Sequence, residues 1–253
     1  MLFILSPSKS QAFTSPRVLK TYQPLFANEV QTLITELKML PETKLGSLMG
    51  ISPKLAKLNF ERFQQFDPQH YIEANSRAAI LAYQGDVYQG LEAETLSDDD
   101  LQFAQQHLLI LSGLYGALRP LDLIQPYRLE MAVRLKFAAY KDLYSFWEDK
   151  LSNYVNERSK TEKTLVNLAS DEYSKVLKPK QIEVQWIKVE FKDQVKGKYQ
   201  VVGLHAKKAR GLMARFIIKH RITDADELKR FDSDGYRFEA SLSNPEHLIF
   251  HRG

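Results

Sequence analysis

The sequence predicts an α/β fold, a single domain over residues 1–253 in which helices flank a mixed and curved sheet. In the first half, short apolar runs alternate with helix-periodic segments, which is typical of strands connected through helices. In the second half, two alternating segments at 182–192 and 198–205 are separated by Lys196-Gly197, which predicts a long hairpin. No linker-like tract divides the 253 residues, so one core is expected.

The individual elements follow from apolar runs, from the helical period and from turn residues. Residues 2–5 form an apolar run that ends at Ser6-Pro7, which predicts a buried strand at the sheet centre. Acidic residues stabilise a helix N-terminus, so Asp98-Asp99-Asp100 predict a helix over 99–107. The other strands outside the hairpin are predicted at 78–83, 108–112, 164–168, 236–240 and 248–252. The other helices are predicted at 25–40, as a pair within 42–66, at 141–157 and at 206–221.

Composition and charge narrow the class of protein. The chain has no cysteine, which excludes disulfides, thiolate chemistry and iron–sulfur ligation. Neither a signal peptide nor an apolar run long enough to cross a membrane is recognisable, so a cytoplasmic location is expected. The net charge of +4 is mild, but Lys and Arg gather in 175–180, 188–198 and 205–221. Such clustering is expected of a protein that binds a polyanion, and a solvated surface is the alternative.

The most specific local signal is the segment 49–56, MGISPKLA. It looks like the hairpin of a helix-hairpin-helix DNA-binding element, with a serine in place of the second glycine. Gly50 can adopt a positive φ and end one helix, while Ser52-Pro53 starts the next. The amides at that start, together with Lys54 and Lys57, suit a phosphate. An ordinary turn between two helices has the same pattern.

Polar residues are dense in the segment 112–131, SGLYGALRPLDLIQPYRLEM, which begins at the end of a predicted strand. The carboxyl end of a strand is a common position for a site in an α/β fold. Asp122 and Glu130 are therefore candidate catalytic carboxylates. In the alternative interpretation, they pair with Arg119 and Arg128 and only fix the loop.

Two more predicted strands end in polar segments of similar layout. Ser6-Pro7-Ser8-Lys9 follows the first strand, and the segment 167–175, NLASDEYSK, includes the end of another. Hydroxyls and a lysine at a strand end suit a phosphate or the edge of a base. Asp171 is a third catalytic candidate, although Ser170 followed by two acids also fits a plain helix start.

The segment 206–221, AKKARGLMARFIIKHR, predicts a basic amphipathic helix. Lys208, Arg215 and Lys219 fall on one stripe with Gly211 beside them, opposite an apolar face. Such a stripe can lie along a phosphate backbone, where the glycine permits a close approach. The alternative is a helix face that only confers solubility.

Six segments together resemble one family of bacterial proteins. They are SPSK at 6–9, AYQGDVYQGL at 82–91, FAQQHL at 103–108, LSGLYGALRPLDLIQPYRLEM at 111–131, NLASDEY at 167–173 and KKARGLMARFII at 207–218. They resemble the YaaA family of peroxide stress resistance proteins, over nearly the whole chain. The resemblance implies a single α/β domain in the cytoplasm that binds double-stranded DNA. It further implies a helix-hairpin-helix element beside a basic cleft, and a role in limiting free intracellular iron during hydrogen peroxide stress.

Two hypotheses from different classes remain. The favoured one is a DNA-binding stress protein, a monomer without a cofactor, a metal, a membrane or an obligate protein partner. Its expected DNA-binding residues are Lys9, Gly50, Ser52, Lys54, Lys57, Arg119, Arg128, Lys175, Lys207, Lys208 and Arg215. The alternative is an enzyme acting on a nucleobase or nucleotide in DNA repair or modification. The resemblance supplies no established catalytic residue, and convergence of Asp122, Glu130 and Asp171 on one enclosed pocket would favour the enzyme.

Overall fold

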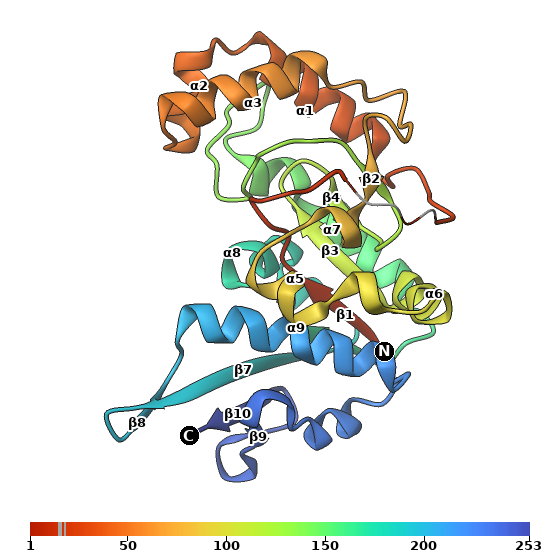
Figure 1. Cartoon of the computed structure of the whole chain (residues 1–253), viewed down its shortest axis with the longest axis vertical. Coiled ribbons are helices and arrows are strands. Elements are labelled where there is room, and N and C mark those ends of the chain that lie inside the picture. The colour runs from red at the N-terminus through yellow and green to blue at the C-terminus, as the bar shows by residue number, and fades with distance from the viewer. Residues whose placement is uncertain (15–16, 18) are drawn as a thin grey trace.

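Figure 1 shows the computed structural model, which describes residues 1–14, 17 and 19–253. Within these residues an eight-stranded sheet has the order β4-β3-β1-β6-β7-β10-β9, with β8 paired to β7. Its strands are β1 Leu2–Leu5, β3 Leu108–Ser112, β4 Gly116–Leu118, β6 Thr164–Asn167, β7 Gln185–Val195, β8 Lys198–Gln200, β9 Arg237–Phe238 and β10 His247–Arg252. A two-stranded sheet joins β2 Arg77–Ala78 to β5 Leu123–Ile124. The predicted fold class, a mixed sheet flanked by helices, is confirmed.

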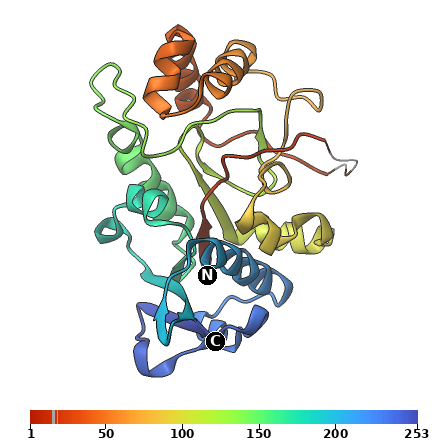
Figure 2. The ribbon, with the colours of Figure 1, turned by 60° about the vertical axis from the view of Figure 1, so that its left-hand side comes forward.

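Three helices group at one end of the molecule, and the others lie along the sheet (Figures 1 and 2). They are α1 Ala27–Met39, α2 Glu42–Met49, α3 Pro53–Gln65, α4 Ala79–Ala82, α5 Asp86–Leu91, α6 Asp98–His107, α7 Leu143–Arg158, α8 Asp171–Ser174 and α9 Gly203–Lys219. Figure 2 shows α1, α2 and α3 together at one end and the C-terminal strands at the other. Helix α9 packs against both β7 and α5.

Strand β1 is a buried interior strand of the sheet, as its sequence predicts, with two strands on one side of it and four on the other along the main path. It pairs in parallel with β3 on one side and with β6 on the other, with Ile4 opposite Leu109 and Asn167. All four of its residues are buried, which explains why the run is apolar on both faces. The three strands run parallel, so their carboxyl ends lie at one edge of the sheet.

The sequence patterns that predict the individual helices α1 and α6 are also confirmed. In α1 the buried residues are Val30, Leu33, Ile34 and Leu37, which is the apolar face that the periodicity predicts. Helix α6 begins with a capping box, in which Ser97 Oγ accepts from Asp100 N and the Asp100 carboxylate accepts from Ser97 N. Within α7, by contrast, the backbone at Glu148 leaves the helical region.

Helices α5 and α9 cross unusually closely because each has a glycine at the contact. A Cβ atom on Gly211 would lie 1.8 Å from the Val87 carbonyl oxygen, and one on Gly90 would lie 2.3 Å from the Lys208 carbonyl oxygen. Gly211 is buried. The prediction that Gly211 permits the approach of a phosphate backbone is therefore wrong, because α5 occupies that position.

Three sequence-based predictions of secondary structure are wrong in part. Residues 78–83 are not a strand, since only Ala78 belongs to β2 and the buried α4 follows. A short apolar run that is buried all round does not distinguish a strand from a helix. The strand predicted at 198–205 ends at Gln200, because α9 begins at Gly203. The strand predicted at 236–240 is shorter, since β9 comprises only Arg237–Phe238, and its partner β10 runs parallel to β7.

Candidate functional site

The carboxyl ends of β1 and β6 bring two polar segments into direct contact. Ser6 follows β1 and Ser170 follows β6, and the Ser170 amide donates a hydrogen bond to Ser6 Oγ at 2.9 Å. The two hydroxyl oxygens are 3.3 Å apart. The carboxyl edge of such strands is where open α/β sheets bind their ligands. The two polar segments that the sequence places at separate strand ends therefore form one polar region in the structure.

A chain of buried hydroxyls extends this region beneath the end of β3. Tyr127 Oη lies 2.6 Å from Tyr83 Oη and 2.7 Å from Ser112 Oγ. The Tyr88 hydroxyl donates to the Ser6 carbonyl oxygen at 3.0 Å. Tyr83, Tyr88 and Tyr127 have at most 6% of their surface exposed, so the hydroxyls have few partners other than each other. Tyr127 belongs to the polar segment 112–131, whereas the sequence interpretation did not single out Tyr83 and Tyr88, which lie in the segment AYQGDVYQGL.

Glu130 is the carboxylate of this region. Its Oε1 atom lies 3.1 Å from Lys9 Nζ and 2.8 Å from Arg128 Nη2. Glu130 Oε2 and Arg128 Nε are both buried, and neither has a hydrogen-bond partner among the described residues. A cavity of about 10 Å³ adjoins them, with Tyr127 and Tyr173 in its wall. We call Lys9, Tyr127, Arg128 and Glu130 the edge site.

The three candidate carboxylates do not converge. Asp122 is fully buried and is bound by Arg119 through a guanidinium contact at 2.8 Å and the backbone amide at 2.9 Å. Burial raises the pKa of Asp122, and its hydrogen bonds with Arg119 oppose that rise. The Asp171 side chain is 89% exposed. The criterion for an enzyme that uses all three is therefore not met, and the Arg119–Asp122 pair fixes its loop.

The turn between α2 and α3 has the backbone that its sequence predicts. Gly50 has a φ of 59°, and the Ile51 amide donates to the Gly46 carbonyl at 3.1 Å, which is a Schellman ending of α2. Ser52 is the N-cap of α3 and accepts from the Leu55 amide at 3.4 Å. The predicted roles of Gly50 and Ser52 in the backbone are confirmed. The Ile51 amide is used within the turn, so it is not available to a phosphate.

The basic stripe predicted on α9 is largely paired with other segments. Arg215 donates to the Leu91 and Glu92 carbonyls at 3.1 and 3.2 Å, at the end of α5. Lys219 pairs with Asp100 at 2.9 Å, and Lys208 lies 3.8 Å from Asp234. The sequence of α9 contains no acidic residue. The carboxylates and carbonyl oxygens that pair with its cations belong to other segments, which only the fold places beside the helix. Arg215 consequently holds α5 and α9 together.

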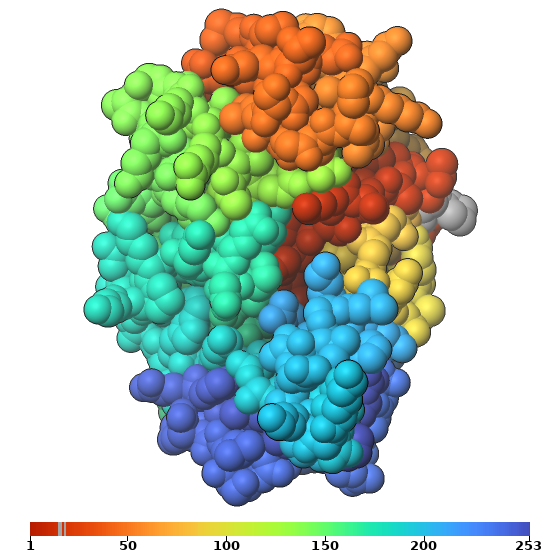
Figure 3. Space-filling model, turned by 90° about the vertical axis from the view of Figure 1, so that its left-hand side faces the viewer, coloured from red at the N-terminus to blue at the C-terminus, as the bar shows by residue number. Residues whose placement is uncertain are grey.

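Other lysines are free to meet an anion. Lys54, Lys57 and Lys207 are exposed and have no hydrogen-bond or ion-pair partner among the described residues. Lys196 and Lys198, at the β7–β8 turn, are equally unpaired within that part of the chain, although neither is among the expected DNA-binding residues. Lys175 lies over the Tyr144 ring at 4.2 Å. Figure 3 shows α2–α3 (orange) and the β7–β8 hairpin (light blue) on one face, with the N-terminal segment (red) between them.

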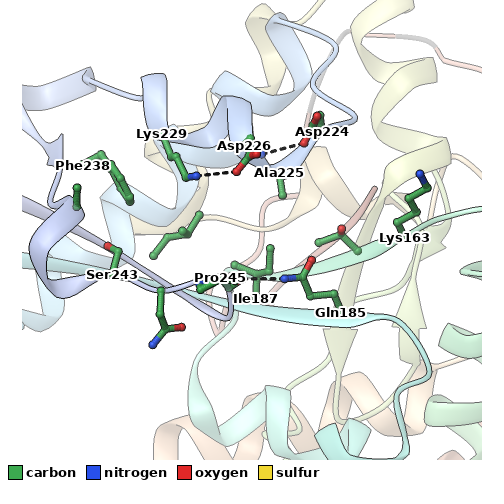
Figure 4. Close-up of a pocket in the computed structure, with 14 residues that line it drawn as sticks. Lys163, Gln185, Ile187, Asp224, Ala225, Asp226, Lys229, Phe238, Ser243 and Pro245 are labelled. Carbon is green, nitrogen blue, oxygen red and sulfur yellow. Dashed lines mark hydrogen bonds and ion pairs between the residues drawn. The ribbon is translucent and has the colours of Figure 1, made fainter.

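A larger cavity of about 610 Å³ lies elsewhere, where β6 and β7 begin (Figure 4). It is within the size range of small-molecule sites. Several of its polar groups are paired: Lys229 with Asp226 at 2.6 Å, and Gln185 Nε2 with the Pro245 carbonyl at 3.0 Å. Figure 4 shows these pairs in its wall. The pairing leaves little in this cavity that specifies a ligand.

The described part of the chain has neither a metal-binding cluster nor a membrane-spanning helix. No cluster of three or more His, Asp or Glu residues there has an arrangement that could hold a metal ion. None of the helices there combines the length and the apolar character that crossing a bilayer requires.

The fold and the edge site define an α/β protein whose polar residues gather at the carboxyl edge of a mixed sheet. A model of the family described as peroxide stress protein YaaA matches residues 1–242. The chain therefore belongs to that family, and the resemblance found in its motifs is confirmed. Membership places the protein in the response to peroxide.

Proposed function

We propose that the protein binds double-stranded DNA during hydrogen peroxide stress, through its backbone phosphates and without altering the DNA chemically. The observation that carries this proposal is the start of α3. Lys54 and Lys57 project there beside the Gly50 turn without an acidic partner in the described residues, whereas Arg215 and Lys219 are paired. The helix-hairpin-helix interpretation and the role in limiting free iron remain part of this proposal.

The backbone at this turn suits a phosphate. Gly50 in the left-handed region reverses the chain, and α3 begins three residues later with 13 residues of aligned peptide dipoles. The amides of Ser52 and Lys54 have no partner among the described residues, while those of Ile51 and Leu55 are used within the turn. Two free amides and two lysines at a helix N-terminus favour an anion without reading a base sequence.

Further cations on the same face would extend the contact along the duplex. Lys207, near the start of α9, is unpaired in the described structure, and Lys9 at the edge site is 61% exposed although it contacts Glu130. The segments that carry them lie between α2–α3 and the β7–β8 hairpin in Figure 3. Contacts of this kind position a protein on DNA and give little sequence preference.

Gly50→Val is expected to weaken duplex binding more than it weakens folding. No atom lies within 4 Å of a Cβ placed on Gly50, so the cost is backbone strain, on the order of 1–3 kcal/mol for a β-branched residue. That strain displaces the start of α3 and its free amides. Fluorescence anisotropy with a labelled duplex gives the affinity, and urea denaturation gives the stability.

Single lysine variants separate charge from geometry. Lys54→Ala should lower the affinity modestly at unchanged stability, whereas Lys163→Ala, at the amino end of β6, should change neither. If the Gly50→Val protein stays folded and binds the duplex as tightly as the parent does, this turn is only an ordinary connection between two helices.

A further inference from the structure

We propose that Tyr127 is a reversible one-electron donor whose phenolic proton passes to Glu130, so that the edge site removes oxidising equivalents generated from peroxide. This activity is additional to DNA binding and does not depend on it. It rests on the direction of the buried hydrogen bonds, on the small cavity and on the unpartnered atoms beside it.

The direction of the Ser112 hydrogen bond follows from its partners. Ser112 Oγ accepts from the Leu114 amide at 3.2 Å and from the Tyr115 amide at 3.0 Å. A hydroxyl oxygen accepts two hydrogen bonds and donates one, so both acceptor positions are filled. The Ser112 hydrogen therefore points to Tyr127 Oη, at 2.7 Å.

Tyr83 also donates to Tyr127. Its hydroxyl is buried, and Tyr127 Oη at 2.6 Å is its partner within the described structure. If Tyr127 were the donor, the Tyr83 hydrogen would be left buried and unpaired, which is costly. Tyr127 Oη thus accepts from both Ser112 and Tyr83, and its own hydrogen must turn elsewhere. Tyr127 and Glu130 both line the small cavity, and we infer that the hydrogen turns toward it.

The cavity is suited to one water molecule. Its volume of about 10 Å³ corresponds to roughly one water-sized probe. Glu130 Oε2 and Arg128 Nε are buried beside it without a protein partner in the described part of the chain, and Glu130 is only 9% exposed. A water accepting from Tyr127 and Arg128 and donating to Glu130 Oε2 would have three polar partners. The phenol would then be connected to a carboxylate by one bridging molecule.

This arrangement allows the phenol to lose an electron and a proton together. Burial raises the pKa of Tyr127 to about 12, so the phenol is neutral at rest. A hydroxyl radical formed from peroxide accepts one electron from the aromatic system and one proton from solvent, and becomes water. The O–H bond of Tyr127 breaks, its proton moves through the bridging water to Glu130, and a neutral tyrosyl radical remains. One electron from a thiol or ascorbate-type reductant, with the proton returned from Glu130, restores the phenol.

Neighbouring rings place Tyr127 in a cluster of buried aromatic side chains over which an electron can move. The Tyr83 and Tyr88 ring centroids are 5.3 Å apart, and Tyr83 contacts Tyr127 through their hydroxyls. The Tyr115 and Tyr127 rings are 5.2 Å apart on the other side. The chain has no cysteine, so no thiol of its own competes as an electron donor.

Electron paramagnetic resonance after brief photo-oxidation tests the proposal. The wild-type protein is mixed with ruthenium tris(bipyridine) and persulfate, illuminated, and frozen at increasing delays. We expect a long-lived tyrosyl signal, which Tyr127→Phe loses and Glu130→Gln reduces severalfold. After ascorbate is added in the dark, the tyrosyl signal should decay as the phenol is restored, more slowly in deuterated solvent for the wild type and without a solvent isotope effect for Glu130→Gln.

Two controls make the outcome decisive. Thermal melting shows whether the near-isosteric variants remain folded, and Tyr199→Phe, which alters an exposed tyrosine, should leave the long-lived signal unchanged. A folded Tyr127→Phe protein with the wild-type signal would overturn the proposal, as would a Glu130→Gln protein with unchanged yield and lifetime.

Discussion

A variant in which Lys54, Lys57 and Lys207 are all replaced by glutamate is expected to lose on the order of a thousandfold in affinity for duplex DNA, roughly tenfold per reversed charge. These three side chains are exposed and unpaired in the described structure, so reversal replaces attraction to a phosphate by repulsion. Their contribution to folding is small, because exposed charges contribute little to stability. Anisotropy titrations at one fixed salt concentration measure the effect.

The matched control reverses three other lysines and produces the same change in net charge. Lys160, Lys163 and Lys229 are exposed and lie around the amino end of β6 and the large cavity, away from the α2–α3 turn. Their replacement by glutamate should lower the affinity far less, through the general field of the protein alone. Equal losses in the two triple variants would show that net charge, and not the α3 start, governs binding.

Gly211→Ala is expected to destabilise the fold strongly. The new Cβ atom would lie 1.8 Å from the Val87 carbonyl oxygen and 2.9 Å from the Leu91 amide nitrogen, so α5 and α9 must separate. Overpacking of this kind costs on the order of 3 kcal/mol. Urea denaturation measures the change in the free energy of unfolding.

Gly203→Ala is the appropriate comparison, since it lies at the start of the same helix and a Cβ there meets no atom within 4 Å. It should leave stability nearly unchanged or raise it slightly. If Gly211→Ala were as stable as Gly203→Ala, the close crossing of α5 and α9 would not be a determinant of the fold.

The parts of the fold that depend on local pattern were predictable from sequence. The apolar run of β1, the run of β3 and the capped start of α6 each contain their own signal, and the structure places them where the sequence does. The residues of α4 contain no such signal, because a buried AILA run suits a helix and a strand equally. The parallel pairing of β10 with β7 joins segments separated by long stretches of chain, which local patterns do not specify.

The candidate site was predictable only as a set of strand ends. The sequence predicted a polar segment after β1 and another after β6, whereas the contact between Ser6 and Ser170 follows from the parallel pairing of the two strands. The pair Arg128–Glu130 was expected as one alternative. The participation of Tyr83 was not foreseen, because its partner Tyr127 is 44 residues away in sequence. For the same reason, the carbonyl partners of Arg215 could not be predicted from the helix alone.

We propose that the face bearing the α2–α3 turn binds DNA phosphates. The most direct test is the dependence of duplex affinity on salt concentration. Each phosphate neutralised on B-form DNA contributes about −0.9 to the slope of log K against log salt. We predict a steep negative slope for the wild type that becomes less steep by about 1 in Lys54→Ala and again in Lys57→Ala. An affinity that does not change between low and moderate salt, or a slope that neither substitution alters, would contradict the account.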